Sequence, residues 1–226
     1  MNWLKNITQK PWEEVSPEVA DDGLAAGRLG GDENKLTAFK FFMAVVTVIF
    51  FLFTITFLQR SQSYDFQALA GELWLPFSDT SLLWRSTALL IGASCSIQIG
   101  FWQAKNEHAR IFLASLLFTI LFTFAFVFSQ LDIWQHMQVT GFGLTRNPAN
   151  SYFYLFTTMH GLHLLVGIYV LLTVTFRALL GQSLNLVNVR LTAYYLHFML
   201  GIWLFLFYLL TRDAEAFKTI AAFCGF

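Results

Sequence analysis

Five long runs of apolar residues lie along the chain, separated by short polar segments. We expect helices at about 39–58, 85–104, 111–133, 152–177 and 191–211. Each run has about 18 residues or more, and a helix rises about 1.5 Å per residue, so each can cross a hydrocarbon core about 30 Å thick. The pattern therefore predicts an all-α polytopic membrane protein, a bundle of five transmembrane helices.

The segments outside these runs are short. Residues 1–37 form a polar arm with acidic pairs, and residues 213–226 form a short C-terminal tail. The composition of the arm is typical of disorder, so we expect it to be ordered only where it lies on a partner. If the N-terminus is inside, nine Lys and Arg residues fall on that side and five on the other. This distribution predicts a cytoplasmic N-terminus and a periplasmic C-terminus.

Composition supports the membrane interpretation and excludes other classes. Hydrophobic residues make up 56% of the chain, 26 residues are Phe, and the formal net charge is zero. A neutral chain shows no preference for nucleic acid or for an acidic soluble substrate. All 14 Asp and Glu residues lie outside the apolar runs or at their edges. A chain without acids at membrane depth is a poor proton carrier on its own.

Three histidines are the main candidates for chemistry. His160 and His163 lie three residues apart on one face of the fourth run, and His197 lies in the fifth. By helical rise, His163 and His197 can lie at similar depth. One interpretation is hydrogen bonding that fixes helix packing. The other is haem ligation between helices, which requires facing histidines. The sequence holds no zinc, nucleophile or phosphate-binding motif, so we predict no catalytic, cofactor-binding or metal-binding residue.

Small residues predict where helices approach closely. Gly92, Ser96 and Gly100 recur every four residues, a pattern typical of packed membrane helices. We expect the same close-contact role for Gly161, Gly167 and Gly201.

Two stretches together carry a family resemblance. Residues 152–167 read YFYLFTTMHGLHLLVG, and residues 194–203 read YYLHFMLGIW. Both resemble signatures of subunit III of the haem-copper respiratory oxidases, in the same order and in adjacent spans. The resemblance covers about Phe39 to Arg212, and the five-helix count is similar to the shorter bacterial members, including quinol oxidase subunit III.

The resemblance implies a non-catalytic subunit of a proton-pumping terminal oxidase that reduces oxygen to water. Such a chain supports assembly, stability and sustained proton uptake of the catalytic subunit, and resides in the bacterial inner membrane. Its implied partners are oxidase subunit I as the main contact, then subunit II, other oxidase subunits and phospholipids. Haem and copper then lie in the partners, and this chain holds no cofactor.

Three departures from the family pattern weaken a proton-linked role. Thr47 stands where the family often has a carboxylate, Leu200 and Gly201 replace an aspartate, and Asp132 is displaced by one position. Two alternatives stay open: an accessory membrane protein of nitric oxide reductase, from the same family, and a haem-b-binding membrane anchor using His163 with His197 or His160. The residues leave the electron donor, cytochrome c or quinol, undecided.

Overall fold

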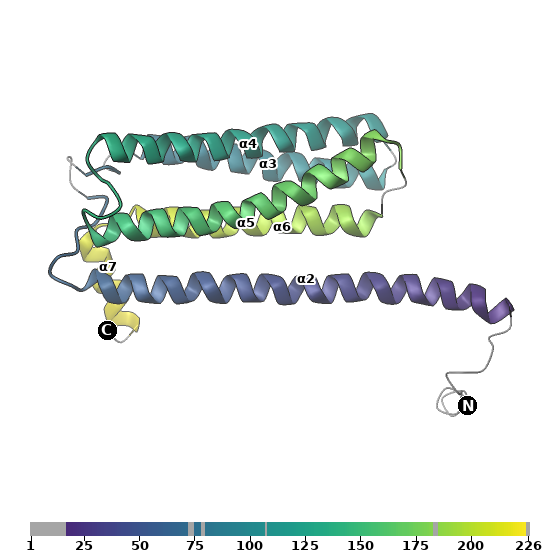
Figure 1. Ribbon diagram of the computed structural model, residues 1–226, viewed down its shortest axis with the longest axis horizontal. Helices are drawn as coiled ribbons and strands as arrows, with labels where there is room; N and C mark the ends of the chain where they lie inside the picture. Colours follow the sequence, from purple (N-terminus) through teal and green to yellow (C-terminus); the bar gives the residue numbers. More distant parts are fainter. Residues whose placement is uncertain (1–16, 72–74, 78–79, 107, 183–184, 225–226) are drawn as a thin grey trace, which may run out of the picture. The chain divides into compact units, whose positions relative to one another are not determined.

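The computed structural model describes residues 17–71, 75–77, 80–106, 108–182 and 185–224, with side chains described from residue 33 to residue 222. These ranges contain six helices (Figure 1). They are α2 (Pro17–Ser61), α3 (Ser81–Lys105), α4 (Ala109–Val139), α5 (Pro148–Leu179), α6 (Leu186–Leu210) and α7 (Ala214–Cys224). Five are long and apolar enough to span a membrane, namely Glu33–Ser61 of α2 and the whole of α3 to α6. The prediction of an all-α, five-span membrane protein is confirmed.

The flanking segments also contain helical residues. Helix α2 includes residues 17–37 of the polar arm, while residues 1–16 lie outside the described part of the chain. The C-terminal tail contains α7. The chain divides into two compact units, residues 1–45 and residues 46–226. The site described below lies entirely in the second unit.

Helix α5 begins earlier than its apolar run because polar residues cap it. The side chain of Asn147 accepts a hydrogen bond from the backbone N–H of Ala149, and Pro148 occupies the first helical position. A capping asparagine followed by proline is a strong start signal, because proline has no N–H to leave unpaired there. Asn147 also exchanges hydrogen bonds with the backbone of Gln67, at 3.2 and 2.6 Å. The cap therefore also ties the start of α5 to the loop after α2.

Helices α3 to α6 run alongside one another and form the centre of the second unit (Figure 1). Helix α3 packs against α4 and α6, and α5 packs against α4 and α6, with the α3–α4 contact the most extensive. The fully buried interior is large and apolar: Ile97, Leu116, Phe153, Leu164, Met199 and Trp203. Burying such side chains contributes about 1.5–3 kcal/mol each in water, and in lipid close packing takes over that role.

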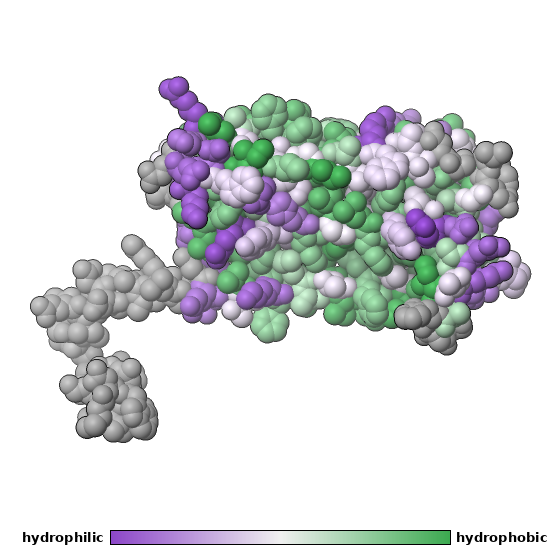
Figure 2. All heavy atoms as spheres, turned by 180° about the vertical axis from the view of Figure 1, so that it is seen from behind, coloured by the Kyte–Doolittle hydropathy of each residue, from purple (hydrophilic) through white to green (hydrophobic). Residues whose placement is uncertain are grey.

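Apolar side chains also cover the outer surface of these helices. On the face drawn in Figure 2, hydrophobic residues occupy the middle of the second unit and hydrophilic residues gather toward its ends. Large side chains such as Phe118, Phe128, Tyr169 and Phe176 are more than half exposed. A soluble protein rarely exposes so wide an apolar surface, whereas a lipid-facing one does.

Helix α7 is fastened by an aromatic cluster. Phe217 is buried, and its ring meets Phe57 and Phe66 edge-on at centroid distances of 5.2 and 5.9 Å. Edge-on aromatic pairs stabilise a contact by about 0.5–1.5 kcal/mol each beyond their buried area. The end of α2, the following loop and α7 therefore share one small core.

Candidate functional site

The histidine on α6 links two helices through both of its ring nitrogens. His197 Nε2 bonds to Gln98 Oε1 at 2.8 Å, and its Nδ1 forms a short hydrogen bond with the hydroxyl of Ser94. The amide oxygen can only accept, so Nε2 carries the proton and Nδ1 accepts from the serine hydroxyl. His197 therefore joins α6 to α3, as expected for a packing role.

The other two histidines have different surroundings, although they share a helix. The ring of His163 is half-buried, stacks at a tilt 5.8 Å from Phe50 of α2, and bonds through Nδ1 to the carbonyl of Met159 at 2.7 Å. This hydrogen bond lies within α5. His160 is only 1% exposed and points toward α4 and α6, between Phe126 and Trp203.

His160 departs from the predicted hydrogen-bonding role. Neither of its ring nitrogens has a hydrogen-bond partner among the described residues. The same is true of both amide atoms of Gln130, a residue of α4 that the sequence did not single out as a site residue. Buried polar groups in folded proteins are nearly always paired, so these four atoms mark an unusual place in the bundle.

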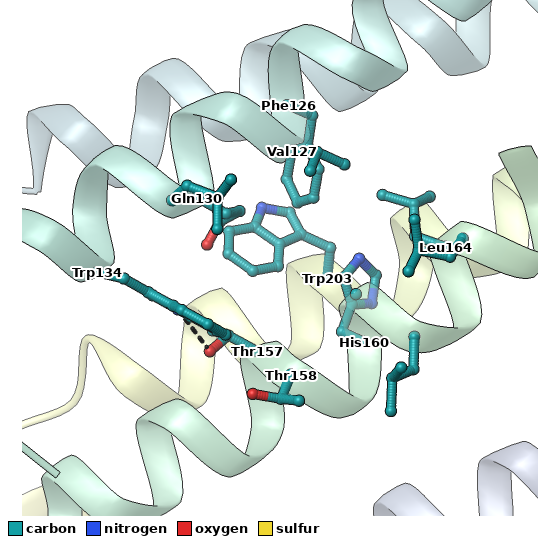
Figure 3. Close-up of a pocket in the computed structure, with 13 residues that line it drawn as sticks. Phe126, Val127, Gln130, Trp134, Thr157, Thr158, His160, Leu164 and Trp203 are labelled. Atoms are coloured by element: carbon teal, nitrogen blue, oxygen red, sulfur yellow. Dashed lines mark hydrogen bonds between the residues drawn. The ribbon is translucent and has the colours of Figure 1, made fainter.

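The unpaired atoms of His160 and Gln130 line one cavity between α4, α5 and α6 (Figure 3). Its volume is about 210 Å³. The indole of Trp203 lies between the amide of Gln130 and the imidazole of His160, and Trp134 forms another aromatic wall. The remaining lining is mainly aliphatic, with Leu131, Leu162 and Leu165 on the outer surface.

Both indoles at the cavity already have hydrogen-bond partners. Trp203 Nε1 donates to Thr87 Oγ1 at 2.9 Å, and Trp134 Nε1 donates to Thr157 Oγ1 at 3.0 Å. In the sequence, Trp203 stands out only as part of a family signature, and Thr87 does not stand out at all. A threonine within an apolar run gives no sign of which neighbouring helix it will meet.

Asp132, the displaced acid of α4, lies away from this interior. Its Oδ2 accepts a hydrogen bond from Arg85 of α3 at 2.7 Å, and both side chains are more than half exposed. It is an exposed acid with an ion-pair partner, in agreement with its place at the edge of the third run. Among the described residues, no group of three His, Cys, Asp or Glu side chains could hold a metal ion.

The six small-residue positions divide into close contacts and open ones. A Cβ at Gly167 would lie 2.9 Å from the ring of Tyr195, and one at Gly100 would lie 3.3 Å from Ser115. A Cβ at Gly92 would meet the ring of Phe122 at 3.4 Å, which is an ordinary contact. Ser96 lies half-buried on the same row of α3.

The prediction of close contacts is wrong for Gly161 and Gly201. A Cβ at either position would meet no described atom within 4 Å. Both glycines line hollows instead. Gly161 lies at the cavity beside His160, and Gly201 lies in an apolar groove of about 330 Å³ between α2 and α6, which also contains Thr47.

Several known proteins resemble this chain over most of its length. The family model for cytochrome c oxidase subunit III matches residues 31–212, which include the spanning part of α2 (Glu33–Ser61) and all of α3 to α6. Cytochrome c oxidase subunit 3 of Artemia franciscana is 26% identical over 87% of this chain and 75% of its own length. Probable quinol oxidase subunit 3 of Staphylococcus saprophyticus is 26% identical over 78% of this chain and 87% of its own length.

A third relative is matched over less of its length. Probable cytochrome c oxidase subunit 3 of Rickettsia prowazekii is 31% identical over 59% of this chain, and the match spans about half of that protein (46%). The family model covers far more than half of this chain, and the matched residues contain all five spanning helices. The chain belongs to the cytochrome c oxidase subunit III family.

Proposed function

We propose that this chain is a non-catalytic subunit III of a proton-pumping haem-copper terminal oxidase that reduces oxygen to water. The observation that carries the proposal is the family match across the whole set of spanning helices, from residue 31 to residue 212. In this proposal the redox metals lie in partner subunits, with subunit I as the main contact and subunit II beside it. The chain resides in a bacterial inner membrane, with its N-terminus cytoplasmic and its C-terminus periplasmic.

The hydrogen bonds of His197 and His163 support a structural role over haem ligation for these two residues. A haem ligand needs a free ring nitrogen directed at the iron. Both nitrogens of His197 are engaged by α3, and the Nδ1 of His163 is engaged by its own helix. Haem binding by His197 would therefore break the bonds that join α6 to α3.

The positions of the acids support a role in stability more than in carrying protons. Thr47 lies in the apolar groove between α2 and α6, where the family often has a carboxylate, and Asp132 pairs with Arg85 at the surface. A neutral interior can stabilise the complex around subunit I, but it offers no carboxylate of its own for a proton relay. Support of proton uptake then acts through the stability of the catalytic subunit.

The groove containing Thr47 is suited to a phospholipid chain. Four phenylalanines, an isoleucine and a glycine accompany Thr47 along it, so its walls are almost entirely apolar: Phe50, Phe51, Phe198, Phe205, Ile202 and Gly201. Hydrocarbon fills such a surface without leaving polar groups unpaired. Bound phospholipid is therefore part of the proposal.

Purification from the native membrane tests the function. The tagged chain is isolated in mild detergent, and the eluate is assayed for haem absorbance and oxygen consumption, with an untagged strain as control. We expect a larger haem-containing polypeptide with oxidase activity, and the preferred electron donor in the assay separates cytochrome c from quinol oxidases. A partner that consumes nitric oxide would replace this proposal with the accessory-protein alternative. A Soret band in the isolated chain would support a haem anchor and refute the proposal.

A further inference from the structure

The cavity beside His160 requires a hydrogen-bond partner from outside the described chain. Four buried polar atoms, two on His160 and two on Gln130, have no partner among the described residues. A buried polar group left unpaired destabilises a protein, so a bundle that keeps four such atoms in one place is expected to pair them with a bound molecule. The indoles of Trp134 and Trp203 are already satisfied, so the unpaired atoms belong to these two side chains.

The bound group must be uncharged. None of the described residues that line the cavity is Asp, Glu, Lys or Arg. A neutral imidazole offers one donor and one acceptor, and a carboxamide offers both as well. Such groups pair with carbonyl or hydroxyl oxygens, whereas a charged head at membrane depth would lack a counter-ion.

Water alone does not suit this cavity. A buried water molecule needs a cavity volume of about 10–15 Å³ and two to four polar hydrogen-bond partners. A cavity of about 210 Å³ is many times larger, yet its walls are mostly the aromatic faces of Phe126, Trp134 and Trp203 and aliphatic side chains. Aromatic walls pair well with a flat ring, which can stack on them while its oxygens reach His160 and Gln130.

The mouth of the cavity opens on the apolar outer surface of the helices. Leu131, Leu162 and Leu165 at its rim are each about half exposed on the outer surface. His160 is twelve residues into α5, about 18 Å from the start of the helix and so near the middle of a hydrocarbon core about 30 Å thick. A phospholipid head stays at the membrane surface, whereas a membrane-dissolved neutral molecule reaches this depth.

We propose that this cavity binds the ring of a neutral membrane amphiphile of the quinone or quinol class. His160 and Gln130 hydrogen-bond the ring oxygens, the indole of Trp203 lies against the ring, and the hydrocarbon tail leaves past Leu162 and Leu165 (Figure 3). The proposal concerns binding only, and no electron transfer within this chain is part of it.

Two open glycines provide a matched pair of variants. A Cβ added at Gly161 or at Gly201 meets no described atom within 4 Å. Gly161→Leu places a side chain in the cavity beside His160, and Gly201→Leu places one in the separate groove beside Thr47. Both changes replace glycine within a helix by a better helix former, so neither is expected to weaken folding. Circular dichroism and gel filtration of each variant confirm that it remains folded.

The full-length chain is reconstituted in nanodiscs of synthetic phosphatidylcholine and titrated with a radiolabelled benzoquinone that carries a ten-carbon tail. We expect saturable binding at about one molecule per chain, weakened by roughly tenfold or more in Gly161→Leu and unchanged in Gly201→Leu, because only the first blocks the ring site. Gln130→Leu removes hydrogen bonds alone and should weaken binding about 2- to 10-fold.

Several results would overturn the assignment. Absence of saturable binding to the folded wild-type chain would refute it, as would equal losses in the two glycine variants. Displacement of the bound label by diacylglycerol as readily as by unlabelled benzoquinone would overturn the assignment to a quinone ring, because the site would then accept neutral lipids in general. The titration uses the chain alone and the test of function uses its native complex, so either proposal can fail without the other.

Discussion

Replacing Gly167 by alanine tests how closely α5 and α6 approach each other. The new Cβ would lie 2.9 Å from Tyr195 Cε1 and 3.1 Å from Cδ1. Carbon atoms in contact normally lie about 3.5–4.0 Å apart, so the ring or the helix must move by about 0.6 Å or more. The ring of Tyr195 is held in place, because it is 6% exposed and its hydroxyl donates to the carbonyl of His163 at 2.8 Å.

Three terms set the expected size of the effect. Forcing a methyl group into a packed interior destabilises by about 1–3 kcal/mol. If the ring moves, the hydroxyl bond to His163 weakens, which adds up to about 1 kcal/mol. Alanine is a better helix former than glycine by about 1 kcal/mol, which offsets part of the loss. The sum spans about 0–3 kcal/mol, and we expect Gly167→Ala to lower the free energy of unfolding by about 1.5 kcal/mol, the middle of that range.

Reversible unfolding of the purified chain in mixed micelles measures this change. Gly161→Ala is the matched control on the same helix: it has the same gain in helix propensity but no described atom within 4 Å, so it should be neutral or stabilising by up to about 1 kcal/mol. With Tyr195→Leu in the background, Gly167→Ala should become nearly neutral, because the ring is gone. Wild-type stability of Gly167→Ala, or an equal loss in Gly161→Ala, would refute the close approach.

Two further changes probe contacts of α3. His197→Leu leaves Ser94 and Gln98 without their partner across the α3–α6 interface and should destabilise by about 1–2 kcal/mol in the same unfolding assay; a loss no greater than about 0.3 kcal/mol would contradict the interhelical role. Arg85→Ala removes the ion pair with Asp132, whose side chains are 53% and 62% exposed, so the loss should stay below about 1 kcal/mol and shrink further in 1 M salt. A larger, salt-independent loss would contradict the interpretation of an exposed, screened ion pair.

The five spans could be predicted from the chain alone, because a helix that crosses lipid must be long and apolar over its whole length. The predicted run 191–211 and the observed Leu186–Leu210 differ mainly at the start, where Asn185 caps α6 by accepting from the N–H of Val187. Polar residues that precede an apolar run can belong to its helix, which also explains the helical residues 17–37. Hydrophobicity therefore locates a span well and its ends less well.

The roles of the histidines could not be predicted in this way. Three residues of a helix correspond to a rotation of about 300°, so His160 and His163 differ in direction by about 60° around the axis of α5. That difference is enough to place His160 against Trp203 and His163 against Phe50. Gln130, which completes the cavity with His160, comes from another helix, and only packing brings the two side chains to one place.

By itself the sequence determined the fold class, the number of spans and the family, because apolar run length and the two signature stretches are properties of local segments. The tertiary structure decided which glycines are close contacts, which histidine joins two helices and where polar atoms lie unpaired. Each of these depends on the partner helix that a given face meets. Gly167 and Gly161 show the difference, because they share a helix and a residue type, yet one faces the ring of Tyr195 and the other faces a cavity.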